Sequence, residues 1–196
     1  MKKNTFAILF FIAPLFSWCQ VNHWETVIYD TLNWQYLIPD ANTSPDWISP
    51  AFNDAAWSNG MGGFGFGDND DSTALPAGTV SIYHRIHFSV IDWSFISRIV
   101  LNMDYDDGYV AYLNGNEIAR SNITSAGQPA WDQGADGQHE AMLYQGAYHD
   151  QIIFEITDWS GIFINGDNVL CIETHNISTN SGDLTSRPFL HFGINN

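Results

Sequence analysis

The sequence predicts an all-β fold, an antiparallel β-sandwich of the jelly-roll type. Three observations predict it: short apolar runs recur along the chain, clusters of Gly, Asn, Asp and Pro separate them, and helical periodicity is nearly absent. Many short strands with frequent turns are typical of such sandwiches. The expected strands are Val27–Tyr36, Val80–Val90, Arg98–Met103, Tyr109–Leu113, Glu117–Arg120, Glu140–Tyr144, Ile152–Ile156, Asn168–Asn176 and Phe189–Ile194.

The run Val80–Val90 alternates most clearly, with apolar residues on one face and Tyr83, Arg85 and His87 on the other. A tyrosine beside an arginine suits a sugar ligand, through ring stacking and directed hydrogen bonds. These three residues are therefore the candidate ligand-binding set. The alternative is a buried arginine satisfied by one of the many carboxylates. His84, on the apolar side, is expected in the core.

Two kinds of connection join the expected strands. Asn114-Gly115 predicts a two-residue hairpin, because both central residues of that turn need a positive φ. Pro39–Gly78 and Asn122–Gln138 are long loops rich in Gly, Asp and Asn. Loops of that length in a compact domain are usually functional or stiffened by a metal.

The N-terminus has the layout of a secretory signal peptide. Lys2 and Lys3 precede the apolar run Phe6–Phe16, and the expected cleavage site lies between Cys19 and Gln20. The run is too short to span a bilayer. A lipidated Cys19 is the alternative, disfavoured by the bulky tryptophan before it. The sequence thus predicts a signal peptide over residues 1–19, one β-sandwich module over residues 20–196, and a secreted or cell-surface location.

Composition narrows the class of partner. Without Lys2 and Lys3, four arginines stand against 22 acidic residues, a formal charge of −18. Such a domain cannot hold a polyphosphate backbone, so nucleic acid is excluded as a partner. High negative charge favours divalent cations instead.

Two acidic loops are candidate Ca²⁺ sites. Asp104, Asp106 and Asp107 precede Gly108, and Asp68, Asp70 and Asp71 lie within the Pro39–Gly78 loop. Carboxylates clustered in this way supply the oxygen ligands that Ca²⁺ prefers. The second loop lacks the final Glu of an EF-hand, so that motif is excluded. The alternative for the first loop is an Asp-Gly turn whose side chains cap the backbone.

The sequence holds none of the common catalytic motifs. It has no His-x-x-x-His pair, no Gly-x-Ser-x-Gly elbow and no Cys-x-x-Cys pair. Glycoside hydrolysis requires two carboxylates at a particular distance in space, and spacing along the sequence does not reveal that distance. The chain is therefore expected to bind rather than to catalyse.

Four segments, in order, resemble the galactose-binding-domain-like jelly roll. They are Phe52–Gly60, Tyr83–Phe88, Asp106–Ile118 and Gly166–Asn176, and the match covers most of residues 30–194. Its relatives include the sugar-binding domains of β-galactosidases and modules beside CotH-like kinase domains in secreted Bacteroidota proteins. Asp106-Asp107-Gly108 also resembles, locally, the paired-Asp calcium and sugar loop of protective-antigen-type lectin domains.

The resemblance implies a non-catalytic accessory module with carbohydrate as the ligand class. It also implies structural roles for Trp57 and for the turns at Asn114-Gly115 and Gly166–Asn168. Two alternatives stay open: a structural or adhesion domain that binds protein surfaces, and the N-terminal fragment of a larger CotH-like or hydrolase protein.

Overall fold

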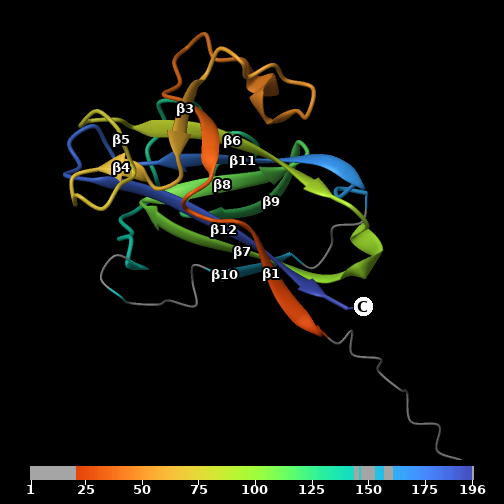
Figure 1. Cartoon of the computed structure of the whole chain (residues 1–196). Coiled ribbons are helices and arrows are strands. Elements are labelled where there is room, and N and C mark those ends of the chain that lie inside the picture. The colour runs from red at the N-terminus through yellow and green to blue at the C-terminus, as the bar shows by residue number, and fades with distance from the viewer. Residues whose placement is uncertain (1–20, 144–145, 147–152, 157–160, 196) are drawn as a thin grey trace, which may run out of the picture.

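The computed structural model describes residues 21–143, 146, 153–156 and 161–195. The predicted signal peptide, residues 1–19, lies outside the described residues. The expected β-sandwich is confirmed: two mostly antiparallel six-stranded sheets pack face to face (Figure 1). No helix in the described ranges is long and apolar enough to cross a membrane.

The first sheet is built around β12 (Leu184–Ile194), which pairs with β7 (Ile96–Asp106), β4 (Phe64–Phe66) and β1 (His23–Ile28). β10 (Ile153–Ile156) extends this sheet beyond β7, and β5 (Thr73–Ala74) pairs in parallel with β4.

The second sheet has the order β3-β2-β6-β11-β8-β9. These strands span Ser58–Met61, Asn33–Leu37, Ser81–Val90, Gly166–His175, Gly108–Leu113 and Asn116–Ser121. Two short 3₁₀ helices, η1 (Pro45–Ile48) and η2 (Trp93–Phe95), lie in the connections.

The main core fills the space between the sheets. Ile82 and Ile86 of β6 face Leu101 and Met103 of β7, and all four side chains belong to one buried cluster. Burying each such side chain stabilises the fold by about 1.5–3 kcal/mol. His84 lies in the same layer with no exposure, its Nε2 2.8 Å from Ser186 Oγ. Its expected place in the core is confirmed.

A second apolar cluster covers the outer face of the second sheet. Trp47 of η1 stacks on Tyr83 at 4.4 Å between ring centroids and meets the ring of Tyr112 edge-on. Phe52 and Trp57 pack against this cluster from the same loop. The Pro39–Gly78 segment, expected to be a long loop, therefore contributes η1, β3, β4 and β5, and it buries much of the sheet face that carries the candidate ligand-binding residues.

Two of the expected strands differ from the structure. Val27–Tyr36 is divided by a turn at Tyr29–Leu32, so that β1 joins one sheet and β2 the other. The described part of Glu140–Tyr144 forms no strand. There the amides of Met142 and Leu143 donate to the Asp104 carboxylate rather than to a neighbouring strand.

The expected hairpin lies between β8 and β9. Asn114 and Gly115 have φ of 50° and 83°, as this turn requires. The Asn114 side chain also donates to Asn168 Oδ1 at 2.7 Å and accepts from the Val169 amide at 2.9 Å. The turn thereby fixes the start of β11.

The pH dependence of stability should report the burial of His84. Burial lowers the pKa of His84 to about 3, against about 6.5 in the unfolded chain. Between these values only the unfolded chain binds this proton, so the free energy of unfolding falls as the pH falls, by up to about 1.4 kcal/mol per pH unit. Urea unfolding between pH 4.5 and 7 should show a smaller slope for His84→Gln. A substitution of the exposed His23 serves as the control, and equal slopes for the wild type and His84→Gln would contradict the assignment.

Candidate functional site

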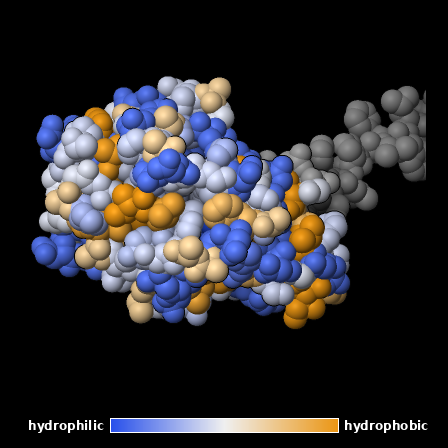
Figure 2. Space-filling view, turned by 90° about the horizontal axis from the view of Figure 1, so that it is seen from above, coloured by the Kyte–Doolittle hydropathy of each residue, from blue (hydrophilic) through white to orange (hydrophobic). Residues whose placement is uncertain are grey.

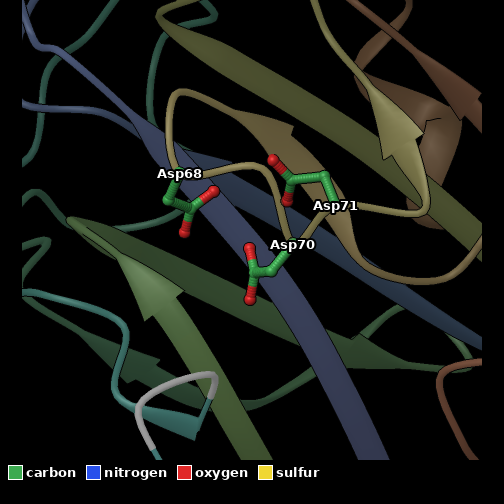
Figure 3. A group of neighbouring side chains, drawn as sticks. All are labelled: Asp68, Asp70 and Asp71. Atoms are coloured by element: carbon green, nitrogen blue, oxygen red, sulfur yellow. The ribbon is translucent and has the colours of Figure 1, made fainter.

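Asp68, Asp70 and Asp71 converge in the connection from β4 to β5, as the carboxylate groups in Figure 3 show. One oxygen of each carboxylate lies within 4.8 Å of the other two. The Oδ1 atom of each is buried and has no hydrogen-bond partner among the described residues. The sequence prediction that these three side chains come together is confirmed. Such a cluster could hold a metal ion.

The electrostatics of this cluster are unfavourable without a cation. Burial, followed by the negative charges of Asp68 and Asp70, raises the pKa of Asp71 to about 7. Burial and Asp68 also raise the pKa of Asp70, against the opposing effect of Arg187. The Arg187 guanidinium donates to Asp70 Oδ2 at 3.2 Å. One arginine thus balances part of the charge of three carboxylates.

Two glycines allow the acidic loop to lie this close to its neighbours. A Cβ at Gly65 would overlap the carbonyl oxygen of Leu184 and the carboxylate of Asp71. A Cβ at Gly67 would overlap Gly182 and Asp183 of the β11–β12 connection, and the φ of Gly67 is 111°. Side chains at these positions would push the Asp68–Asp71 loop away from β12.

The second predicted group, Asp104, Asp106 and Asp107, does not converge. Asp104 accepts from the amides of Met142 and Leu143 at 2.8 and 3.1 Å. Asp107 accepts from the amides of His139 and Ile177 at 2.8 and 2.7 Å. These two carboxylates anchor loop backbone, which corresponds to the capping alternative considered from the sequence.

Asp106 instead meets two residues that were not predicted as metal ligands from the sequence. One oxygen each of Asp106, Glu140 and Asp183 lie within 4.8 Å of one another. Burial and the charges of Asp107 and Asp183 raise the pKa of Asp106 to about 9. Glu140 and Asp183 lie 34 and 77 residues along the chain from Asp106, so no local motif could have identified them.

Tyr83, Arg85 and His87 share the outer face of β6, as predicted, but only His87 is substantially exposed. Tyr83 lies under Trp47. Arg85 has no exposed surface and donates from Nε to Asp54 Oδ2 at 2.8 Å. His87 Nδ1 lies 2.9 Å from Asp167 Oδ2. The buried, paired arginine is the alternative considered from the sequence, and a sugar-binding role for the three stays a prediction.

A groove beside this face is lined by Trp131, and we call it the Trp131 groove. It comprises two pockets that share Trp131. One, of about 120 Å³, is also lined by Tyr83, Asp40 and Gln128. The other, of about 340 Å³, is also lined by Ile38 and Thr179. Trp131 is 38% exposed, and its carbonyl oxygen accepts a hydrogen bond from Ser81.

Figure 2, seen from the side that is uppermost in Figure 1, shows separate hydrophobic patches among hydrophilic residues. An exposed aromatic ring beside polar groups in a concave surface is a common arrangement for a small polar ligand. Trp131 could not be singled out from the sequence, because the exposure of one tryptophan in a long loop depends on how that loop packs.

Comparisons with known proteins show similarity in fold. No protein-family model matches the sequence, and no curated protein matches it. The chain is similar to a solved structure of Bacteroides uniformis β-glucuronidase, with 14% identity and a TM-score of 0.50. It is similar to a calcium-binding mutant of Bacteroides uniformis β-glucuronidase 2, with 13% identity and a TM-score of 0.52. Each match covers 87% of this chain and 18% of the other chain.

A third similar structure is a β-glucuronidase from an uncultured Clostridium species, with 15% identity and a TM-score of 0.51. The match covers 96% of this chain and 31% of that one. The chain therefore has the fold of a β-sandwich domain that forms a minor part of these larger enzymes. The predicted relation to modules beside CotH-like kinase domains stays a prediction.

Removing the partner of the buried arginine should destabilise the fold. Asp54→Asn leaves the Arg85 charge buried without its carboxylate, so we expect the free energy of unfolding to fall by about 3 kcal/mol. Glu25→Gln is the matched control, because the His23–Glu25 pair is exposed and contributes at most about 1 kcal/mol. Chemical unfolding of both variants checks this. Equal small losses would mean that the Arg85–Asp54 pair does not hold the loop.

Proposed function

We propose that this chain is a secreted, non-catalytic accessory module that binds carbohydrate in the Trp131 groove. The observation that carries the proposal is the groove itself, in which the exposed Trp131 lies beside Asp40, Gln128 and Tyr83. The apolar face of a sugar packs on an aromatic ring, while its hydroxyl groups need directed polar partners.

The fold similarity supports an accessory role. The β-glucuronidases similar to this chain are far longer than it, and the matched part is 18–31% of their length. A domain of this kind beside a glycosidase would hold the substrate near the catalytic domain. Tyr83 then contributes from the sheet face that borders the groove, and Arg85 holds the covering loop in place through Asp54. His87, exposed on the same face of β6, would extend the ligand-binding surface beyond the groove.

We also propose that Asp68, Asp70 and Asp71 bind a structural Ca²⁺. One oxygen of each carboxylate is at a separation from the other two that suits ligands of one ion, and Ca²⁺ is coordinated by carboxylates at about 2.3–2.6 Å. Each of the three residues also has a buried Oδ1 without a hydrogen-bond partner. Neutralising the three charges would remove their mutual repulsion and fix the loop against β12.

A protein surface is the second candidate partner. Ile91 is 95% exposed, and Trp93 and Phe95 nearby are 44% and 49% exposed. A pocket of about 410 Å³ beside them is lined by Phe192 and Ile194 among others. Exposed apolar groups of this kind suit contact with another domain. A glycan array without any signal would leave this function as the better supported one.

Carbohydrate binding is tested with a glycan array and one substitution. We expect binding of at least one glycan class by the full chain, and Trp131→Ala should weaken it by about 30-fold, the equivalent of about 2 kcal/mol for a central aromatic contact. Trp93→Ala is the control, because Trp93 is similarly exposed but lies outside the groove. Binding that survives Trp131→Ala unchanged would exclude the groove, and no binding with or without EDTA would exclude the lectin function.

Calcium in the Asp68–Asp71 loop is tested by thermal unfolding. An ion at 100 times its dissociation constant adds about 2.7 kcal/mol of stability, which corresponds to a rise in Tm of about 5 °C or more for a domain of this size. Asp71→Asn should reduce this rise, whereas Asp30→Asn, at an exposed position outside the loop, should not. A Tm independent of Ca²⁺ in the wild type would contradict the proposal.

A further inference from the structure

A second cluster of oxygens lies at the same end of the sandwich, where β7 ends and β12 begins. We propose that Asp106, Glu140 and Asp183 bind a Ca²⁺ ion at a site separate from the Asp68–Asp71 loop. The three residues come from the end of β7, from the loop after Asn122, and from the β11–β12 connection. They meet only in the folded chain.

The spacing of the three side chains suits one shared ion. Their nearest oxygens all lie within 4.8 Å of one another. Two ligands on opposite sides of a Ca²⁺ ion, each at about 2.4 Å, are separated by about that distance. A single cation between the three oxygens is therefore within reach of all of them.

The state of Asp106 points independently to a missing partner. Its side chain is 4% exposed, and its Oδ1 atom is buried without a hydrogen-bond partner. A buried carboxylate without a partner is costly, and native structures seldom leave one. Among the described residues no arginine, lysine or histidine pairs with Asp106, Glu140 or Asp183. The groups nearest to Asp106 are themselves carboxylates, namely Asp107, Asp183 and Glu140.

The type of ligand atom selects the ion. Three carboxylates without nitrogen or sulfur favour a hard cation, Ca²⁺ or Mg²⁺, over Zn²⁺ or Cu²⁺. Mg²⁺ requires near-ideal octahedral geometry and is seldom held by protein side chains alone, whereas Ca²⁺ accepts irregular sets of six to eight oxygens. Glu140 is exposed, so the ion can enter from that side and complete its shell with water.

An ion here would tie together segments that also line the Trp131 groove. The loop that carries Glu140 also carries Trp131, and the connection that carries Asp183 also carries Thr179. The amides of His139 and Ile177, in these same two segments, already donate to Asp107. A cation at this site would therefore link the same two segments a second time, in addition to their hydrogen bonds to Asp107.

The alternative to a cation is a proton held by Asp106 and shared with its neighbours. Calorimetric titration of Ca²⁺ into the EDTA-stripped full chain separates the two. Two binding events are expected in the wild type, one for each cluster. Glu140→Gln and Asp183→Asn should each abolish binding at the Asp106 site and leave binding at the Asp68–Asp71 loop. Asp71→Asn should have the opposite effect.

Asp132→Asn is the matched control, because it removes an exposed carboxylate from the same loop as Glu140 and should leave both events intact. Glu140→Gln changes an exposed side chain, so it tests the site even if Asp183→Asn fails to fold. Mg²⁺ in place of Ca²⁺ should bind at least tenfold more weakly to the Asp106 site. Unchanged Ca²⁺ affinity and stoichiometry in both Glu140→Gln and Asp183→Asn would overturn the site, whatever happens in the Asp68–Asp71 loop.

Discussion

The repulsion among buried carboxylates at one end of the sandwich is the constraint on which the loops there depend. The connections after β4, β7 and β11 all meet at this end (Figure 1). Asp104 and Asp107 are satisfied by backbone amides, and Asp70 is paired through one oxygen with Arg187. Asp71 and Asp106 have no such partner, and their pKa values are raised to about 7 and about 9. Cations at the two clusters would turn this repulsion into a set of links between three loops.

On the outer face of β6 the buried charge is positive and its partners are present. The Arg85 guanidinium donates to Asp54 and to the carbonyl oxygens of Trp47 and Ser49. These bonds fix the loop that carries η1 over the second sheet, which shapes one wall of the Trp131 groove. Asp183 and Glu140 lie in the segments that supply Thr179 and Trp131 to that groove. Three segments therefore border the proposed ligand site. The loop with η1 is held by the hydrogen bonds of Arg85, and the loops with Trp131 and Thr179 would be fixed by a cation bound to Glu140 and Asp183.

Local patterns in the sequence predicted the features that depend on neighbours in the chain. Alternation identified β6 and the core position of His84, and the spacing of Asp68, Asp70 and Asp71 identified a real cluster. The role of Arg85 was undecided, because burial depends on a loop more than 30 residues away that covers the sheet. Glu140 and Asp183 were missed for the same reason. Asp183 is brought to Asp106 by the pairing of β12 with β7. Glu140 is brought there by its loop, whose His139 and Met142 amides donate to Asp107 and Asp104.

Anomalous scattering from crystals grown with Ca²⁺ is the most direct measurement of whether cations hold the acidic end together. The expected result is a peak about 2.3–2.6 Å from carboxylate oxygens of Asp106, Glu140 and Asp183, with a second peak among Asp68, Asp70 and Asp71. Ordered loops with no peak at either cluster, and with Asp106 in a short hydrogen bond to another carboxyl group, would contradict a cation at this end of the sandwich.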